Sequence, residues 1–175
     1  MLLALGACVH EPAPAYQAGI ANLQALRISS TTMAVDTFTA EEGVNDSRLI
    51  MRGNSMTGGG PDSTFSAYLQ QALEIELRNA GRFDTASRLR LSGALSENRL
   101  STADFSVGSA TVRARFVLTR DGQVIYDKVH TAEHEWDSSF LAALAIPAGM
   151  QGYVATVQKL IGDLFTDPDF IAATR

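Results

Sequence analysis

Cys8 is the only cysteine of the chain, and it ends a short apolar run with the sequence MLLALGAC. A single thiol can form neither an internal disulfide nor a cysteine-rich metal site. A helix over this run would span far less than the roughly 30 Å hydrocarbon core of a bilayer, so the run is too short to cross a membrane. An apolar stretch closed by small residues is typical of the end of an export signal. The sequence therefore predicts that residues 1–7 are the remainder of such a signal.

Ser55 is the candidate nucleophile, because it lies in the glycine-rich stretch GNSMTGGG. His130 or His134 would be its candidate base. The stretch departs from the G-x-S-x-G nucleophile elbow, since Thr57 stands where that tight turn needs glycine. It also lacks the Gly-Lys-Ser/Thr ending of a phosphate-binding loop. The pattern favours a surface loop with no cofactor, and a hydrolase built on Ser55 stays an alternative.

A second polar cluster follows in the stretch HTAEHEWD, at residues 130–137. On a helix, His130 and His134 would lie one turn apart and could share a metal ion. The stretch alternates as a strand does, and there four residues span about 13 Å, too far for one zinc to bridge. We therefore expect a solvated strand face and no metal at these histidines.

The charge balance limits the partners. Fourteen Lys and Arg residues against nineteen Asp and Glu residues give a formal net charge of -5. A chain with this excess of acidic residues lacks the positive charge that binding a phosphate backbone requires, so we expect no nucleic-acid partner. A length of 175 residues, 46% of them hydrophobic and 19% charged, predicts one globular domain rather than a disordered chain.

The first half of this domain is predicted as a strand, a long loop and a helix. Residues 23–38 are rich in β-branched side chains and indicate a strand. Residues 39–61, with three consecutive glycines, indicate a long loop. A helix capped by Asp62 or Ser63 is expected to end at Gly81. Its apolar residues fall three and four positions apart: Phe65, Leu69, Ala72, Leu73 and Leu77.

The second half is predicted as a three-stranded antiparallel meander followed by a helix. Apolar and polar residues alternate over residues 89–95 and 110–118. The Asp-Gly pair at 121–122 favours a tight hairpin into a third strand over 124–136. The apolar stripe at 148–165 indicates the last helix, with Pro147 at its start.

These elements predict an α+β fold in which two helices pack on one face of a four-stranded sheet. The other face is then open to water or to a partner, and Arg113 and Arg115 lie on it by alternation. The expected organisation is a residual signal over 1–7, a lipidated tether over 8–22 and a single α+β domain over 23–175. The tether is expected to be extended and without a fold, because prolines at 12 and 14 disfavour helix.

Leu5, Gly6, Ala7 and Cys8 match the lipobox of bacterial lipoprotein signals position by position, and the chain's start resembles such a signal. The resemblance implies that Cys8 is acylated and becomes the mature N-terminus. Two or three acyl chains would make a stable membrane anchor. Val9 follows the cysteine, where an Asp is associated with retention at the inner membrane. The resemblance therefore implies the periplasmic face of the outer membrane.

The order of elements behind the lipobox resembles small bacterial envelope lipoproteins, among them lipopolysaccharide-assembly lipoproteins and auxiliary lipoproteins of lipid-transporting ABC systems. The stretch TRDGQVIYDK at 119–128 is similar to a hairpin of uncharacterised proteobacterial lipoproteins. These resemblances imply a non-catalytic accessory role with an envelope complex or a lipid as partner. A partner chain would meet the face bearing Arg113 and Arg115, or an exposed sheet edge. A Ser-dependent envelope hydrolase and a purely structural or binding lipoprotein are the alternatives.

Overall fold

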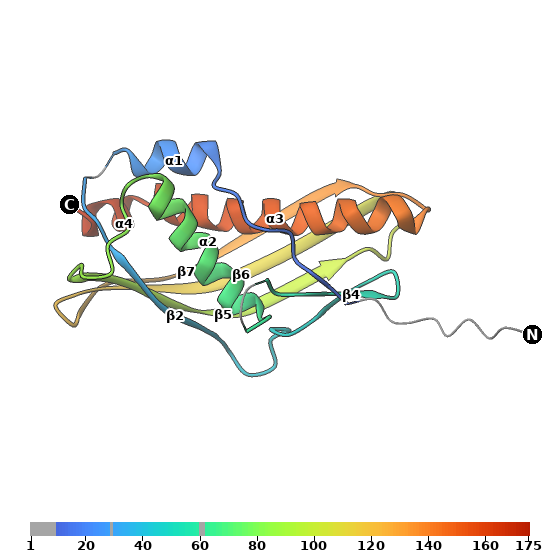
Figure 1. Ribbon diagram of the computed structural model, residues 1–175, viewed down its shortest axis with the longest axis horizontal. Coiled ribbons are helices and arrows are strands. Elements are labelled where there is room, and N and C mark those ends of the chain that lie inside the picture. Colours follow the sequence, from blue (N-terminus) through green and yellow to red (C-terminus); the bar gives the residue numbers. More distant parts are fainter. Residues whose placement is uncertain (1–9, 29, 60–61) are drawn as a thin grey trace, which may run out of the picture.

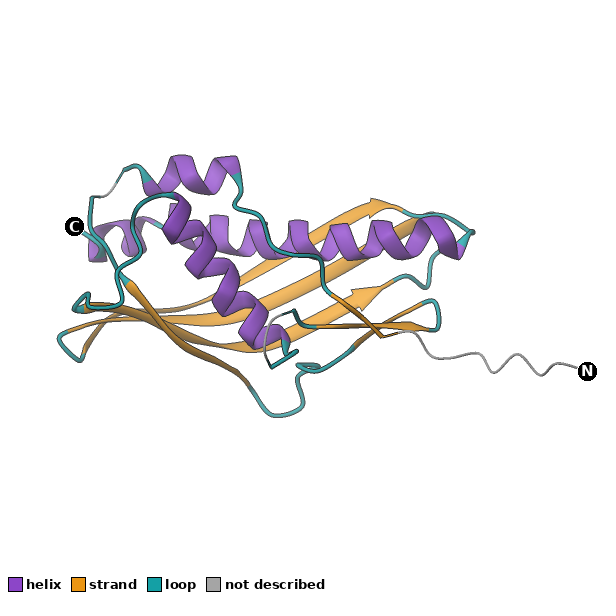
Figure 2. Ribbon diagram, viewed as in Figure 1, coloured by secondary structure: helices purple, strands orange, loops and turns teal. Residues whose placement is uncertain are grey.

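The computed structural model of the protein describes residues 10–28, 30–59 and 62–175. The predicted signal and its lipid attachment site lie outside these residues: 1–7, with Leu5, Gly6 and Ala7, and Cys8. The described residues have the predicted α+β fold, but four helices rather than the predicted two lie on one side of the four-stranded sheet (Figures 1 and 2).

The larger sheet contains the predicted meander. It consists of β2 (Ala34–Ala40), β5 (Leu89–Ser101), β6 (Val107–Arg120) and β7 (Gln123–Asp137), in the order β2-β5-β6-β7. The pairs β5–β6 and β6–β7 are antiparallel, whereas β2 runs parallel to β5. A parallel neighbour requires a crossover connection, which here contains a helix.

The hairpin between β6 and β7 turns at the predicted Asp-Gly pair. Asp121 and Gly122 have φ values of 53° and 81°. Both residues are in the left-handed region that a two-residue hairpin demands and that glycine adopts at little cost. The prediction of this turn from its dipeptide is confirmed.

A second, smaller sheet occupies part of the chain for which no regular structure was expected. It contains β1 (His10–Pro12), β3 (Leu49–Met51) and β4 (Asn54–Thr57), in the order β1-β4-β3. The prediction of an unbroken loop over 39–61 is wrong, because β3 and β4 form an antiparallel hairpin within it. The prediction of an unfolded tether is also wrong over its described residues, because β1 pairs in parallel with β4.

α1 (Ile20–Leu26) was not predicted, and α2 (Phe65–Asn79) differs from the sequence prediction only at its N-cap. Residues 23–26 were expected to begin a strand and instead end α1, while β2 starts only at residue 34. In α2 the N-cap is Thr64, whose hydroxyl accepts a hydrogen bond from the Ala67 amide at 3.2 Å. The local helix signal was correct for α2, and only the capping residue was wrong.

The C-terminal helices are longer than predicted. α3 (Ala142–Thr166) starts before Pro147, which lies inside the helix. Pro147 is the sixth residue of α3, beyond the first turn whose amides have no partner within the helix, so it removes one hydrogen bond to the residue four positions earlier. Asp167 ends α3 and caps α4 (Pro168–Ala173), accepting a hydrogen bond from the Asp169 amide at 2.7 Å.

The core lies between the four-stranded sheet and the helices. α3 contacts β6 and β7, α2 contacts β2, and α1 lies over α2 and α3 (Figure 1). Phe65 of α2 and Tyr153 of α3 pack with ring centroids 5.1 Å apart. Trp136 of β7 lies against two glycines, because a Cβ at Gly108 or Gly152 would come within 2.3 Å or 2.2 Å of its ring. These glycines allow the close approach of strand and helix.

A buried carboxylate joins the N-terminal segment to this core. Glu76 of α2 is fully buried, and its Oε1 atom accepts three hydrogen bonds. The donors are the Tyr16 hydroxyl at 2.6 Å, the Gly19 amide at 2.9 Å and the Asn22 side-chain amide at 2.8 Å. Asn22 also donates to the Gln158 carbonyl of α3 at 3.0 Å. Glu76 therefore fixes the segment around α1 to both long helices.

We expect the Glu76→Ala variant to lose about 3 kcal/mol or more of its free energy of unfolding. The substitution leaves buried donors without an acceptor, and each unmade hydrogen bond of this kind costs about 1–3 kcal/mol. Glu74→Ala, at a partly buried position of the same helix where the carboxylate pairs with Arg78, is the matched control and should cost less than about 1 kcal/mol. Chemical denaturation of both variants measures the difference, and equal losses would contradict the role of Glu76.

Candidate functional site

The open face of the four-stranded sheet carries the two arginines that alternation predicted there. Arg113 and Arg115 are both exposed on β6. The Arg115 guanidinium binds both carboxylate oxygens of Asp127 on β7, with the Nε–Oδ1 distance at 2.7 Å. Arg113 lies between two strands, 3.1 Å from Glu97 Oε2 on β5 and 2.9 Å from the Thr131 hydroxyl on β7.

Further ion pairs continue this pattern across the face. Arg90 of β5 binds Asp36 of β2, and Arg99 binds Glu97 within β5. The hydrogen bonds and charge of Asp36 raise the pKa of Arg90. The pairs made by Asp36 and Asp127 are exposed, and such pairs contribute only about 0–1 kcal/mol each, whereas the side chain of Glu97 is only 14% exposed. A polar partner could therefore replace the exposed pairs at little cost, which suits this face to reversible protein contact.

The edge of the sheet at β7 is the second predicted contact surface, and part of it is already covered. The Lys159 ammonium of α3 donates to the main-chain carbonyl of Glu133 at 2.9 Å. A lysine at a strand edge protects it from pairing with another chain. Addition of a partner strand along all of β7 would require Lys159 to move, so the open face is the better candidate.

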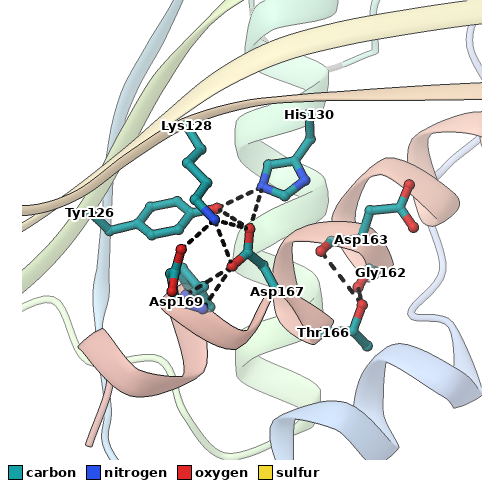
Figure 3. A network of polar contacts seen from close by, with 9 residues as sticks. Tyr126, Lys128, His130, Gly162, Asp163, Thr166, Asp167 and Asp169 are labelled. Atoms are coloured by element: carbon teal, nitrogen blue, oxygen red, sulfur yellow. Dashed lines mark hydrogen bonds and ion pairs between the residues drawn. The ribbon is translucent and has the colours of Figure 1, made fainter.

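At the other end of β7 a polar network joins the strand to the α3–α4 junction (Figure 3). The Lys128 ammonium lies 2.9 Å from Asp167 Oδ2 and 2.6 Å from Asp169 Oδ2. The Tyr126 hydroxyl lies 2.6 Å from His130 Nε2 and 3.3 Å from Asp167 Oδ2. Asp167 is thus the centre of the network and also the N-cap of α4.

Burial and charge shift the pKa values of this network. Burial, opposed by the charges of Asp167 and Asp163, lowers the pKa of His130. Burial alone would raise the pKa of Asp167, but hydrogen bonds from Lys128 and from the α4 amides outweigh it and lower that pKa. Burial together with the Asp167 charge raises the pKa of Tyr126 well above its usual value. The arrangement favours a neutral imidazole beside a charged carboxylate, which stabilises the junction.

The structure does not bring Ser55 together with either histidine predicted as its base. Ser55 is buried in β4, and its hydroxyl contacts His10 Nδ1 of β1. His130 belongs to the network around Asp167, and the His134 ring lies 6.1 Å from that of Trp136. The strand predicted for both histidines is confirmed, whereas the pairing with Ser55 is wrong because β4 belongs to the other sheet.

Within the part of the chain that the structure describes, no three His, Cys, Asp or Glu residues are grouped so as to hold a metal ion. Among the same residues, no helix is long and apolar enough to cross a bilayer.

Sequence reasoning missed the residues that hold these sites together. Glu76 was not identified, although position 76 continues the apolar stripe of Leu69, Ala72 and Leu73 with an acid, which is a signal of a buried carboxylate. The pairing of His10 with Ser55 has no sequence signal, because it spans 45 positions between two short strands.

The fold is similar to those of two solved bacterial proteins. XCC0632 from Xanthomonas campestris, of the DUF330 family, aligns with a TM-score of 0.57 at 16% identity, over 90% of this chain and 95% of that one. A putative lipoprotein from Caulobacter crescentus CB15 aligns with a TM-score of 0.51 at 12% identity, over 87% of this chain and 95% of that one. At these identities the likeness establishes a shared fold. Comparison by sequence finds no matching family model and no matching curated protein.

The pKa of His130 makes the stability of the β7–α3 junction depend on pH. Because this pKa is lower in the folded protein, its contribution is present above the unfolded value of about 6.5 and is lost as pH falls through the folded value. We expect the free energy of unfolding to fall from about pH 7.5 to 5.5, and His130→Gln to reduce this fall. Denaturation at several pH values measures it, and an unchanged slope in the variant would contradict the assignment.

Proposed function

We propose that the protein is an outer-membrane-anchored periplasmic lipoprotein that serves as a non-catalytic accessory in envelope assembly or lipid transport. The observation that carries the proposal is the position of β1. Its first residue, His10, follows the lipobox cysteine Cys8 by two positions and is already paired with β4. The folded body therefore begins at the site of lipid attachment. The fold shared with a protein titled as a lipoprotein supports this reading.

This geometry fixes the body close to the bilayer. Two residues span at most about 7 Å of extended chain, so a lipid on Cys8 keeps β1 near the headgroups. The segment after β1 is in turn attached to the core, because Tyr16, Gly19 and Asn22 donate hydrogen bonds to buried Glu76. The anchor is thereby coupled to the core, and the accessory would hold a defined position for its partner.

The open sheet face is the surface proposed for a protein partner. Arg113 and Arg115 are exposed and lie next to the acids Glu97 and Asp127. A face with both charge signs matches a polar partner surface and sets its orientation. The helix-covered face is filled by the core, so the open face presents the larger accessible area of the sheet (Figure 2).

A non-catalytic role agrees with the contacts of the candidate nucleophile. The Ser55 hydroxyl is buried, and its contact is with a histidine of the adjacent strand rather than with His130 or His134. A hydrolytic nucleophile needs its oxygen within reach of a substrate carbonyl. The hydrolase alternative is therefore the less favoured one.

The proposed lipid anchor predicts the mass of the mature protein and the loss of membrane binding when Cys8 is replaced. The mature protein should lack residues 1–7 and carry two or three acyl chains on Cys8, because a single chain holds a protein only marginally at a membrane. Intact-mass spectrometry of protein from membranes measures this. The Cys8→Ser variant should retain the leader and lose most of its flotation with vesicles in a density gradient. An unmodified cysteine in a fully membrane-bound protein would contradict the anchor.

The Arg113→Glu/Arg115→Glu variant should recover at least about tenfold less of its crosslinked envelope partner, because reversed charges oppose the complementary surface. Arg78→Glu/Arg88→Glu is the matched control, with the same change of charge on exposed arginines of α2 and of the loop before β5. Quantitative mass spectrometry of the crosslinked complex compares the two variants, after thermal unfolding has shown both to be folded. Equal recovery from the two would contradict the proposed surface.

A further inference from the structure

Large apolar side chains are exposed together at the end of the molecule that carries β1. Phe105 in the β5–β6 loop is 57% exposed, and Phe140 in the loop before α3 is 74% exposed. Three further apolar residues are exposed on the adjoining elements: Ile50 of β3, and Leu141 and Leu144 at the start of α3. Figure 1 shows the β3–β4 hairpin, the β5–β6 loop and the start of α3 at this same end. Such gathering of apolar side chains on a surface marks an interaction site.

Contacts between these loops hold the side chains in one cluster. The rings of Phe105 and Phe140 have centroids 5.4 Å apart. Arg52, in the turn between β3 and β4, lies 4.6 Å from the centroid of the Phe105 ring. Its guanidinium also donates to the carbonyls of Asp104 at 3.1 Å and Ser139 at 3.3 Å. One arginine therefore ties three loops together, and the apolar surface is formed before any partner arrives.

The cluster is continuous with the start of the described chain. In the small sheet, His10 pairs with Ser55, and Ser55 pairs with Ile50 on the other side. Two strand spacings separate His10 from Ile50, which is about 10 Å. Ile50 in turn lines one surface hollow with Arg52 and Phe105. The chain therefore enters the described structure at His10, close to the apolar surface.

We propose that this apolar end, defined by Ile50, Phe105, Phe140, Leu141 and Leu144, inserts into the interface of the lipid bilayer. The inference rests on the proposed lipid anchor and adds a second, protein-borne contact to it. Aromatic and aliphatic tips of this kind bury about 5–10 Å into the boundary between headgroups and acyl chains. Arg52 places a cation beside the rings, at the depth where anionic headgroups lie. The bilayer is the occupant because the acyl chains bring it to this surface.

The contact would orient the whole body. With the apolar end in the bilayer, the long strands of the sheet lead away from it, and the hairpin between β6 and β7 lies at the far end (Figure 1). The open face with Arg113 and Arg115 then stands beside the membrane rather than against it. The anchor alone would allow the body to rotate about a short tether, whereas two contacts restrict it.

The test places an indole at each end of the full-length acylated protein. Phe140→Trp reports on the apolar end, and Val124→Trp, at an exposed position near the opposite hairpin, is the matched control. Both are reconstituted in phosphatidylethanolamine and phosphatidylglycerol vesicles with either plain or brominated acyl chains. Emission from Trp136 is subtracted by measuring the parent protein. We expect brominated chains to reduce the emission from position 140 at least about twofold and to leave that from position 124 unchanged.

A second measurement separates this contact from the anchor. Unacylated Cys8→Ser protein should partition weakly onto the same plain vesicles, and Phe105→Ser/Phe140→Ser should lower that partition at least about tenfold. Val124→Ser/Val129→Ser removes two exposed apolar side chains elsewhere and should not lower it. All four side chains are exposed, so we expect only small changes in thermal unfolding, the larger one in Phe105→Ser/Phe140→Ser because this variant removes the ring contact and the contact with Arg52.

Two results would overturn the membrane contact. The first is equal tryptophan emission from position 140 in plain and brominated vesicles, while the acylated protein still floats with both. This result would contradict the apolar contact and leave the lipid anchor intact. The second is a concentration-dependent dimer that the Phe105→Ser/Phe140→Ser variant no longer forms, although it partitions onto vesicles as the parent does. This result would show that the surface binds a second copy of the chain. Failure of the anchor itself would instead appear as an unmodified Cys8 by mass.

Discussion

The buried carboxylate of Glu76 is the interaction on which the arrangement of the N-terminal segment depends. Burial of an acid is costly, and here the cost is offset at one oxygen, Oε1, which accepts from the Tyr16 hydroxyl, the Gly19 amide and the Asn22 side chain, whereas Oε2 has no hydrogen-bond partner among the described residues. Without that acceptor the same donors would be buried and unpaired, so segment and helix stabilise each other. Gly162 makes room for this contact, since a Cβ there would lie 2.7 Å from Asn22 Oδ1.

The same constraint explains why β1 can be short. A three-residue strand contributes few hydrogen bonds of its own, and an isolated piece of this length would not persist. After β1 the chain continues directly into the segment with Tyr16, Gly19 and Asn22, which Glu76 fixes in place. Because this neighbouring segment is already ordered, ordering β1 costs less conformational entropy. The first described residues are therefore part of the folded body, so the proposed lipid on Cys8 would be joined to the body by a very short piece of chain.

The local pattern of apolar and polar residues was enough to predict the helices and strands that bury one regular face. It failed for the elements whose structure depends on contacts between residues far apart in the sequence. The alternation at 110–118, the Asp-Gly turn and the stripe of α3 each identify their element from a few neighbouring residues. The small sheet could not be predicted, because β1 pairs with a strand 45 positions away and β3 is only three residues long. The contact of Ser55 with His10 depends on that same pairing, so the spacing of histidines along the sequence carried no information about it.

The polar surface with Arg113 and Arg115 and the apolar surface with Phe105 and Phe140 lie on different parts of the same sheet. Their relative position would affect how an accessory protein meets its partner. Lys128 and Tyr126 meet Asp167 where α3 ends, so α3 is fixed to β7 at its C-terminal end, while Trp136 of β7 packs on Gly152 in the first half of the helix. A helix held at two separate points limits the movement of the strands beneath it. A contact made by the loops around Phe105 and Phe140 would then determine where Arg113 and Arg115 are presented, because the strands that link the two surfaces do not bend independently.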